Sequence, residues 1–234
     1  CKYRFGLTGT LDGTQTHQLV LEGLFGAAEK VVTTKELIDK NTLANLKIKC
    51  LILRHPNIRE KMTYAEELEY IVSNEKRIDF VVNLLRHLNG NTLCLFQLVE
   101  KHGKILNDKM KGSENVYFVY GGTDTSDREK IRGLVETHTK STTIASFGVF
   151  STGINIRNIN NIVLASPSKS KIRVLQSIGR GLRRSDIKDS ILIYDIADDI
   201  SYNERRNFTL NHFTERLNIY NEEQFDYDIS KVKL

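Results

Sequence analysis

The sequence lacks several features that would assign it to particular protein classes. It has no tryptophan, two prolines and three cysteines in 234 residues. So little proline excludes rigid proline-rich linkers. Cys1, Cys50 and Cys94 are too far apart to form zinc-ligand pairs. Cys50 and Cys94 lie within apolar runs, so we expect buried free thiols. No secretory signal or apolar run of membrane length is present, which predicts a soluble cytoplasmic protein without a membrane partner.

The sequence also lacks the parts that bind and activate a nucleoside triphosphate. No Gly-Lys-Ser or Gly-Lys-Thr occurs, so there is no phosphate-binding loop of the usual type. The acidic cluster 195–199 follows the apolar run 191–194, and we interpret it as a strand end and a polar turn. The sequence therefore predicts no metal site within this chain.

Composition indicates a folded protein with a modest basic excess. Hydrophobic residues make up 40% of the chain, enough to form a core and to argue against disorder. Lys and Arg number 34 against 29 Asp and Glu, for a net charge of +5 and a pI near 9.0. This excess permits nucleic-acid contact without proving it. Without tryptophan, base stacking would use Phe or Tyr, and the sequence marks no stacking platform.

From about residue 46, short apolar segments alternate with segments of helical periodicity. The expected strands are 48–53, 92–96, 116–120, 142–146, 162–165 and 191–194. The expected helices are 63–89, 99–110, 126–136 (capped by Thr125 or Ser126) and 202–223. Continuously apolar strands separated by helices predict an α/β fold with a parallel sheet covered on both faces.

The most informative segment is Gln-Ser-Ile-Gly-Arg-Gly-Leu-Arg-Arg at 176–184. On a helix, Gln176, Arg180 and Arg183 share one face, while an apolar stripe packs on the core. Guanidinium groups held outward suit a phosphate, because their planar fork binds its oxygens in pairs. A solvated basic helix face is the alternative interpretation.

This segment resembles motif VI of the superfamily 2 helicases, in their second RecA-like lobe. Residues 144–155 resemble motif V, and residues 5–10 resemble motif III at the end of the first lobe. The stretches 146–155 and 170–176 are similar to those of a phage helicase that remodels branched DNA. The resemblance implies a RecA-like parallel sheet. It assigns residues 1–45 to the tail of the first lobe and the interdomain linker, and residues 46–234 to the second lobe.

The resemblance also implies nucleotide-site roles. Arg183 is the expected arginine finger, and Gln176 orients nucleotide and water. Arg180 lies close by and contacts either phosphate or the acidic motif of the first lobe. Gly153 and Asn155 match the Gly-x-Asp/Asn signature of motif V, with asparagine in place of the commoner aspartate. Gly179 completes the set, for close approach of the opposite lobe, with a packing glycine as the alternative. Thr8 and Thr10 in motif III are assigned instead to nucleic-acid binding.

Nucleic-acid contacts are implied at several strand ends. Ser146 ends a predicted strand, where a hydroxyl is placed to hold a phosphate or merely to cap the strand. Gly121, Gly122 and Arg128 resemble a further phosphate-contact motif, although a glycine pair before a helix is often only a turn. His102-Gly103-Lys104 resembles motif IV, and a solvated Lys104 is an equal alternative.

We therefore expect the second motor lobe of an ATP-dependent DNA helicase or translocase. Its implied partners are the first lobe and branched or forked DNA, with roles in recombination, repair and replication-fork remodelling. ATP and Mg²⁺ would be bound mainly by the first lobe, so the chain alone should be inactive, and a phage protein would act in the host cytoplasm. Two alternatives stay open: a non-enzymatic nucleic-acid-binding module, and the lobe of an RNA helicase or restriction-type translocase.

Overall fold

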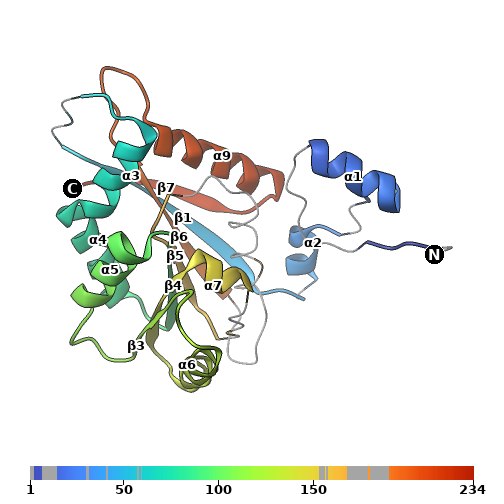
Figure 1. The fold of residues 1–234 in the computed structure, drawn as a ribbon, viewed down its shortest axis with the longest axis horizontal. Helices are drawn as coiled ribbons and strands as arrows, with labels where there is room; N and C mark the ends of the chain where they lie inside the picture. Colours follow the sequence, from blue (N-terminus) through green and yellow to red (C-terminus); the bar gives the residue numbers. More distant parts are fainter. Residues whose placement is uncertain are drawn as a thin grey trace.

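A computed structural model gives the fold of the chain (Figure 1). It describes residues 3–6, 15–29, 32–40, 42–56, 58, 60–152, 156, 158–167, 179 and 190–234. Within these residues, no helix combines the length and apolar character needed to cross a membrane.

A seven-stranded sheet forms the centre of the molecule, with strand order β3-β4-β2-β5-β6-β1-β7. All its neighbouring strands pair in parallel. The strands are β1 (Asn45–Arg54), β2 (Asn91–Phe96), β3 (Val116–Val119), β4 (Ser141–Ser146), β5 (Asn161–Leu164), β6 (Ser190–Asp199) and β7 (Tyr227–Lys233). The six predicted strands are present, and β7 is an additional edge strand that the sequence did not indicate, since its side chains are mostly exposed.

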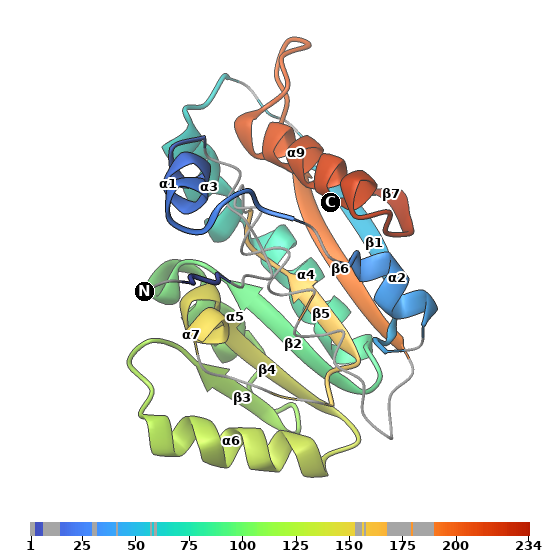
Figure 2. The ribbon, with the colours of Figure 1, turned by 90° about the vertical axis from the view of Figure 1, so that its right-hand side faces the viewer.

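Helices cover both faces of the sheet, as Figure 2 shows. They are α1 (Gln15–Phe25), α2 (Thr34–Asp39), α3 (Tyr64–Ser73), α4 (Glu75–His87), α5 (Lys104–Lys109), α6 (Thr125–Thr137), α7 (Phe147–Thr152) and α9 (Phe208–Glu222), with a π-helix at Val99–Gly103. One core cluster joins α6, α7 and α9 to the sheet, and the other joins α4 and α5. Successive residues of β2 alternate between these clusters, because side chains of a strand point to opposite faces.

The helix predicted over 63–89 is two helices. Asn74 leaves the helical conformation (ψ 113°), which ends α3. Its side chain then accepts a hydrogen bond from the Arg77 backbone N–H at 3.0 Å and so caps α4. Asparagine favours such caps because its short side chain competes with the helical backbone for hydrogen bonds. The periodicity extended across the break because both helices bury the same kind of apolar face.

Two further predictions at helix starts are wrong. The cap position of α6 is Asp124, not Thr125 or Ser126, which are already helical. The helix predicted over 202–223 begins only at Phe208, and the residues before it form a tight turn. In both cases the apolar pattern located the helix but not its first residue.

The N-terminal helix α1 stands apart from this core (Figure 1). Its apolar side chains are exposed, among them Leu19, Val20, Leu24 and Phe25. The assignment of residues 1–45 to another lobe stays a prediction.

Candidate nucleotide and nucleic-acid interface

Most of the predicted nucleotide-site residues lie outside the described part of the chain. These are Gln176, Arg180, Arg183, Gly153 and Asn155, and Thr8 and Thr10 of motif III also fall there. Gly179 is described; it is exposed, and a Cβ added to it would meet nothing within 4 Å. Space at Gly179 is therefore compatible with close approach of another surface.

The predicted nucleic-acid contacts Ser146, Gly121 and Gly122 meet at one edge of the sheet. Ser146 is the last residue of β4, and the glycine pair follows β3. These two strands are neighbours, with Val119 opposite Ala145, so both segments emerge at the carboxyl edge. Ligands of open parallel sheets gather at this edge.

Ser146 is the nearly buried last residue of β4. The residue is 7% exposed. Within the described residues its side chain has no hydrogen-bond partner, unlike Ser141 at the other end of β4, which donates to Asn91 Oδ1 at 2.7 Å. A strand-end hydroxyl without a partner has unused capacity for a phosphate oxygen.

The glycine pair sits in a turn that is supported from both sides. Thr123 closes the turn, because its hydroxyl accepts from Tyr120 N–H at 3.1 Å and its own N–H donates to Tyr120 C=O at 2.9 Å. A Cβ on Gly122 would lie 2.7 Å from the Tyr120 ring, so any other residue would have to displace that ring. Arg128 Nη2 donates to Gly121 C=O at 3.0 Å. Arg128 thus braces the loop rather than projecting as a free cation.

Lys104 is less available than the motif comparison implied. It lies at the start of α5 and forms an ion pair with Glu100, with Nζ and Oε2 at 2.7 Å. The hydrogen bond to Glu100 raises the pKa of Lys104. Because both side chains are largely exposed, this pair adds little stability, and phosphate would have to compete with Glu100 for the ammonium.

The π-helix that precedes Lys104 directs the side chain of His102 toward the protein interior. His102 is fully buried, and its Nδ1 lies 2.9 Å from Ser166 Oγ, just after β5. Burial and the nearby Arg77 guanidinium lower the pKa of His102 to about 3, so its imidazole is neutral. A Cβ on Gly103 would lie 2.4 Å from the Phe96 ring. His102 and Gly103 therefore hold the β2 and β5 ends together.

The acidic cluster 195–199 is the main correction to the sequence interpretation. β6 runs through Asp199, and Asp195 and Asp198 are fully buried rather than in a polar turn. Asp195 receives a bidentate pair of hydrogen bonds from Arg216 of α9, together with the Tyr220 hydroxyl at 2.8 Å. These carboxylates anchor helices to the sheet.

Asp198 pairs with an arginine of α4 on the other face of the sheet. Its Oδ1 lies 2.7 Å from Arg77 Nε and 2.8 Å from His55 Nε2. Burial alone would raise the pKa of Asp198, but the Arg77 charge and the hydrogen bonds from His55 and Arg77 lower it. Arg77 also donates to Ala165 C=O at 2.8 Å. The sequence signal for these pairs is an arginine within the apolar face of a helix, beside Ile78 in α4 and Phe213 in α9.

A third buried carboxylate, Glu67 of α3, caps α9. It accepts from the backbone N–H groups of Phe208 at 2.8 Å and Thr209 at 2.9 Å. A carboxylate at a helix N-terminus satisfies free backbone donors and interacts favourably with the helix dipole. Together the three carboxylates fix α3, α4 and α9 on the sheet.

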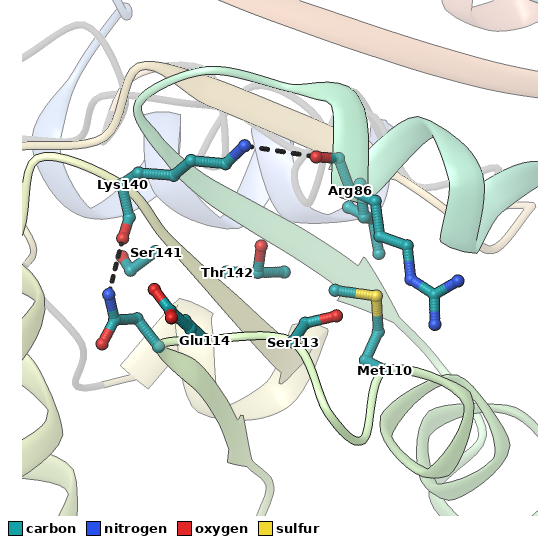
Figure 3. A pocket seen from close by; sticks show the side chains of 9 residues that line it. Arg86, Met110, Ser113, Glu114, Lys140, Ser141 and Thr142 are labelled. Atoms are coloured by element: carbon teal, nitrogen blue, oxygen red, sulfur yellow. Dashed lines mark hydrogen bonds between the residues drawn. The ribbon is translucent and has the colours of Figure 1, made fainter.

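A cavity of about 370 Å³ lies at the opposite, amino-terminal edge of the sheet (Figure 3). Arg86, Lys140, Ser141 and Thr142 are among its lining residues. The two cations are engaged with backbone carbonyls: Lys140 Nζ with Arg86 C=O at 3.2 Å, and Arg86 Nη2 with Lys109 C=O at 2.7 Å. The cavity contains none of the predicted site residues.

Comparisons with known proteins agree with this fold and motif order. The family "Helicase conserved C-terminal domain" matches residues 76–185. The chain is 34% identical over its whole length to the ATP-dependent DNA helicase uvsW of Enterobacteria phage T4, and it spans about half (50%) of that protein.

Solved structures show the same architecture. The crystal structure of T4 UvsW matches 90% of this chain and 44% of its own, with a TM-score of 0.70 and 34% identity. The C-terminal domain of the DEAD-box protein Dbp5 matches 83% of this chain and 92% of its own (TM-score 0.53, 15% identity). The restriction-modification enzyme LlaBIII matches 91% of this chain and 17% of its own (TM-score 0.60, 11% identity). These last two likenesses concern the fold alone.

The parallel RecA-like sheet, the matched helicase domain and the identity along the whole chain together support a superfamily 2 helicase C-terminal RecA-like lobe similar to that of UvsW.

Proposed function

We propose that this chain is the second motor lobe of an ATP-dependent DNA helicase or translocase that acts on branched DNA, in recombination, repair or replication-fork remodelling. The observation that carries the proposal is the 34% identity, over the whole chain, to an ATP-dependent DNA helicase. The Gln-x-x-Gly-Arg-x-x-Arg segment at 176–183 lies within the matched helicase domain.

In this proposal, Arg183 acts as the arginine finger. Its charge would stabilise the transferring phosphoryl group, an effect worth about three to five orders of magnitude in rate. Arg180 would bind phosphate, Gln176 would orient nucleotide and water, and Gly153 and Asn155 would relay the nucleotide state. The donor set at 176–183 is one amide and two guanidinium groups, which suits phosphate oxygens.

The same donor set has no carboxylate for Mg²⁺. The described carboxylates nearest in sequence, Asp195 and Asp198, are already engaged with Arg216 and Arg77. Within this chain the chemistry therefore supports phosphate binding and charge stabilisation. Magnesium binding belongs to the first lobe, and we expect the chain alone to release phosphate from ATP at background level.

The carboxyl edge at β3 and β4 would form part of the nucleic-acid track. The Ser146 hydroxyl, which has no hydrogen-bond partner in the described part of the chain, and the exposed Gly121–Gly122 backbone support this role, with Arg128 bracing the loop. Such groups contact phosphates and carry no base information. We expect binding that is nearly independent of sequence and that weakens as salt rises.

The first lobe would pack near α1. The exposed apolar side chains of that helix support a covering partner, because contiguous exposed apolar surface marks interaction sites.

Steady-state kinetics of the intact helicase test the proposal. Arg183→Ala should lower kcat by about three to five orders of magnitude and change KM little, because a finger acts on transition-state charge. Arg184→Ala, the matched control, should have a much smaller effect. If Arg183→Ala raises only KM, the residue is a ground-state contact and the finger assignment is wrong. Parallel assays with branched DNA, duplex DNA and RNA decide the substrate class.

A further inference from the structure

A tight β-turn projects from the carboxyl end of β6. Tyr202 and Arg205 exchange backbone hydrogen bonds of 3.1 and 3.0 Å across it. The two residues between them, Asn203 and Glu204, have positive φ of 46° and 63°. Consecutive positive φ values are those of the type I′ turn of β-hairpins. Asparagine tolerates this conformation, whereas glutamate is strained in it, and such strain concentrates at functional sites.

The turn is firmly fixed at its base by the buried Asn207. Its Oδ1 accepts from Ile200 N–H at 3.2 Å. Its Nδ2 donates to Asp198 C=O at 3.1 Å and to Thr209 Oγ1 at 2.8 Å. Figures 1 and 2 show the turn extending beyond the sheet, next to the loop that precedes α3. The projecting backbone therefore has a defined shape.

Three aromatic rings form a cluster at the base of this turn. Tyr64 is the first residue of α3, and Phe208 is the first residue of α9. The Tyr64 ring lies 6.4 Å from that of Phe208 and 5.3 Å from that of His212, both in edge arrangements. Tyr64 and Phe208 are 39% and 44% exposed. Aromatic side chains in mutual contact and open to solvent have apolar ring surface available for a ligand.

Cations flank these aromatic residues along the chain. Arg205, at the turn, is exposed, and its side chain has no hydrogen-bond or ion-pair partner among the described residues. Arg206 donates to Thr214 Oγ1 at 3.0 Å and is otherwise exposed. Lys61, three residues before Tyr64, is exposed as well. The exposed acidic residues of the same segments are Glu60, Glu66, Glu204 and Glu215, and Glu66 accepts a hydrogen bond from the Thr63 backbone N–H at 2.7 Å.

We propose that this aromatic–basic surface, formed by Tyr64, Phe208 and His212 with Arg205 and Arg206, binds single-stranded nucleic acid. Unpaired bases would stack on the rings, and the arginines would bind backbone phosphates, the combination that serves single-strand recognition without sequence preference. The inference rests on the proposed function in one respect, that the partner is nucleic acid. It adds a second nucleic-acid contact to the one proposed at β3 and β4, and it specifies that the bases bound there are unpaired.

The position of the surface fits a strand that also contacts Ser146. β6 and β1 lie three and four places from β4 in the sheet. At about 4.8 Å per strand this is roughly 14 to 19 Å along the carboxyl edge. At about 3.4 Å per stacked nucleotide, a single strand of four to six nucleotides spans that distance. The faces of bases within a duplex are already stacked on neighbouring base pairs, so duplex DNA should not stack on the aromatic rings.

The absence of tryptophan allows a direct test. Phe208→Trp introduces the only tryptophan of the chain, and Phe25→Trp is a matched reporter, since both phenylalanines are 44% exposed. We expect a twelve-nucleotide single-stranded oligonucleotide to quench Phe208→Trp fluorescence strongly, because stacked bases quench indole. Blunt duplex and heparin should quench it little. Phe25→Trp should respond to none of them.

Binding measurements on the same chain give the second readout. Phe208→Leu should raise the Kd for single strands about five-fold or more, the low end of the contribution of one stacked base. Phe25→Leu should leave the Kd unchanged. Arg205→Ala should reduce the slope of log K against log salt by about one, whereas Arg86→Ala, at the opposite edge of the sheet, should not. Far-UV circular dichroism checks that each variant is folded.

The outcomes separate this inference from the proposed function. If single strands bind but Phe208→Leu and Arg205→Ala bind as well as the parent chain, the aromatic–basic surface is not a nucleic-acid contact and only this inference fails. Equal quenching by heparin and by single strands also overturns it, because charge alone would explain the response. If the chain binds no nucleic acid under any condition, the proposed track fails too. Quenching of Phe208→Trp on self-association without nucleic acid would identify the surface as a protein interface instead.

Discussion

The two halves of the carboxyl edge of the sheet use polar side chains in opposite ways. At β6, Asp195 and Asp198 are buried and engaged with arginines from α9 and α4. At β3 and β4, the Ser146 hydroxyl has no hydrogen-bond partner among the described residues, and Gly121 and Gly122 expose their backbone. The polar side chains of the β6 half thus hold helices on the sheet, whereas those of the β3–β4 half make no such contacts among the described residues. Unused hydrogen-bonding capacity alone does not distinguish the two halves, since Asp198 Oδ2 and Arg77 Nη1 also lack partners. The difference is that the β6 half holds buried charge pairs, whereas the candidate ligand edge presents an uncharged hydroxyl and exposed backbone.

The largest loss of stability is expected when a buried ion pair of the β6 half is removed. Asp198→Ala leaves the buried Arg77 guanidinium without its counter-charge, which typically costs about 3–5 kcal/mol. Urea unfolding should show this loss in the free energy of unfolding. Asp228→Ala, which breaks an ion pair that is 60% and 63% exposed, should cost less than about 1 kcal/mol. A loss as small for Asp198 as for Asp228 would mean that the pair does not anchor α4.

The packing of the π-helix gives the next effect. Gly103→Ala places a Cβ 2.4 Å from the Phe96 ring, and overpacking of this kind costs about 1–3 kcal/mol. Gly133→Ala lies within α6 where a Cβ would meet nothing within 4 Å, so it should stabilise the chain by about 0.5–1 kcal/mol. Thermal unfolding of the two variants should therefore shift in opposite directions. A stabilised Gly103→Ala variant would contradict the close contact.

Acid should destabilise the fold through His102, which lies between the ends of β2 and β5. The folded chain lowers the pKa of this imidazole from 6.5 to about 3, so the unfolded chain binds a proton that the folded chain does not. Stability should fall as pH drops below 6.5, by about 1.4 kcal/mol per pH unit, or about 2 kcal/mol at pH 5. His102→Asn should flatten this slope in urea unfolding at several pH values. His87→Asn, at an exposed site on α4, should leave the slope unchanged.

The smallest effect on stability is expected at the β3–β4 half. Ser146→Ala should change the free energy of unfolding by less than about 0.5 kcal/mol and raise the Kd for nucleic acid about two- to ten-fold, the effect of one hydrogen bond. Ser141→Ala, at the other end of β4, should do the reverse, because it removes the hydrogen bond to Asn91. Fluorescence anisotropy and urea unfolding on both variants decide the contrast. Similar binding by the two would remove Ser146 from the track.

Much of the fold follows from sequence periodicity. The apolar segments around Ile48, Leu93 and Ile162 identified strands of a parallel sheet, because strands covered on both faces are apolar throughout. The buried free thiols of Cys50 and Cys94 were predicted from their apolar surroundings and are confirmed. Burial raises the pKa of Cys94 to about 12, so its thiol is protonated. The roles predicted for Gln176, Arg180 and Arg183 stay predictions.

Element boundaries depended on local hydrogen bonds that periodicity does not register. Asn74 ends one helix and caps the next, and Asp124 rather than Thr125 precedes α6. The edge strand β7 gave no signal, because its mostly exposed side chains do not form an apolar run. Such features depend on single side chains or on backbone pairing. Neither changes the hydrophobic periodicity of a sequence segment enough to be recognised.

By itself the sequence determined the α/β class, the order of the strands along the chain and the helicase motifs, since these follow from local pattern and residue identity. Only the tertiary structure decided which charges are buried and which rings are exposed. Arg77 and Asp198 are separated by 121 positions, and Tyr64 meets Phe208 from a different helix. The physical reason is that burial and pairing of polar groups depend on which elements the sheet topology brings together, and that topology is set by packing of the whole core.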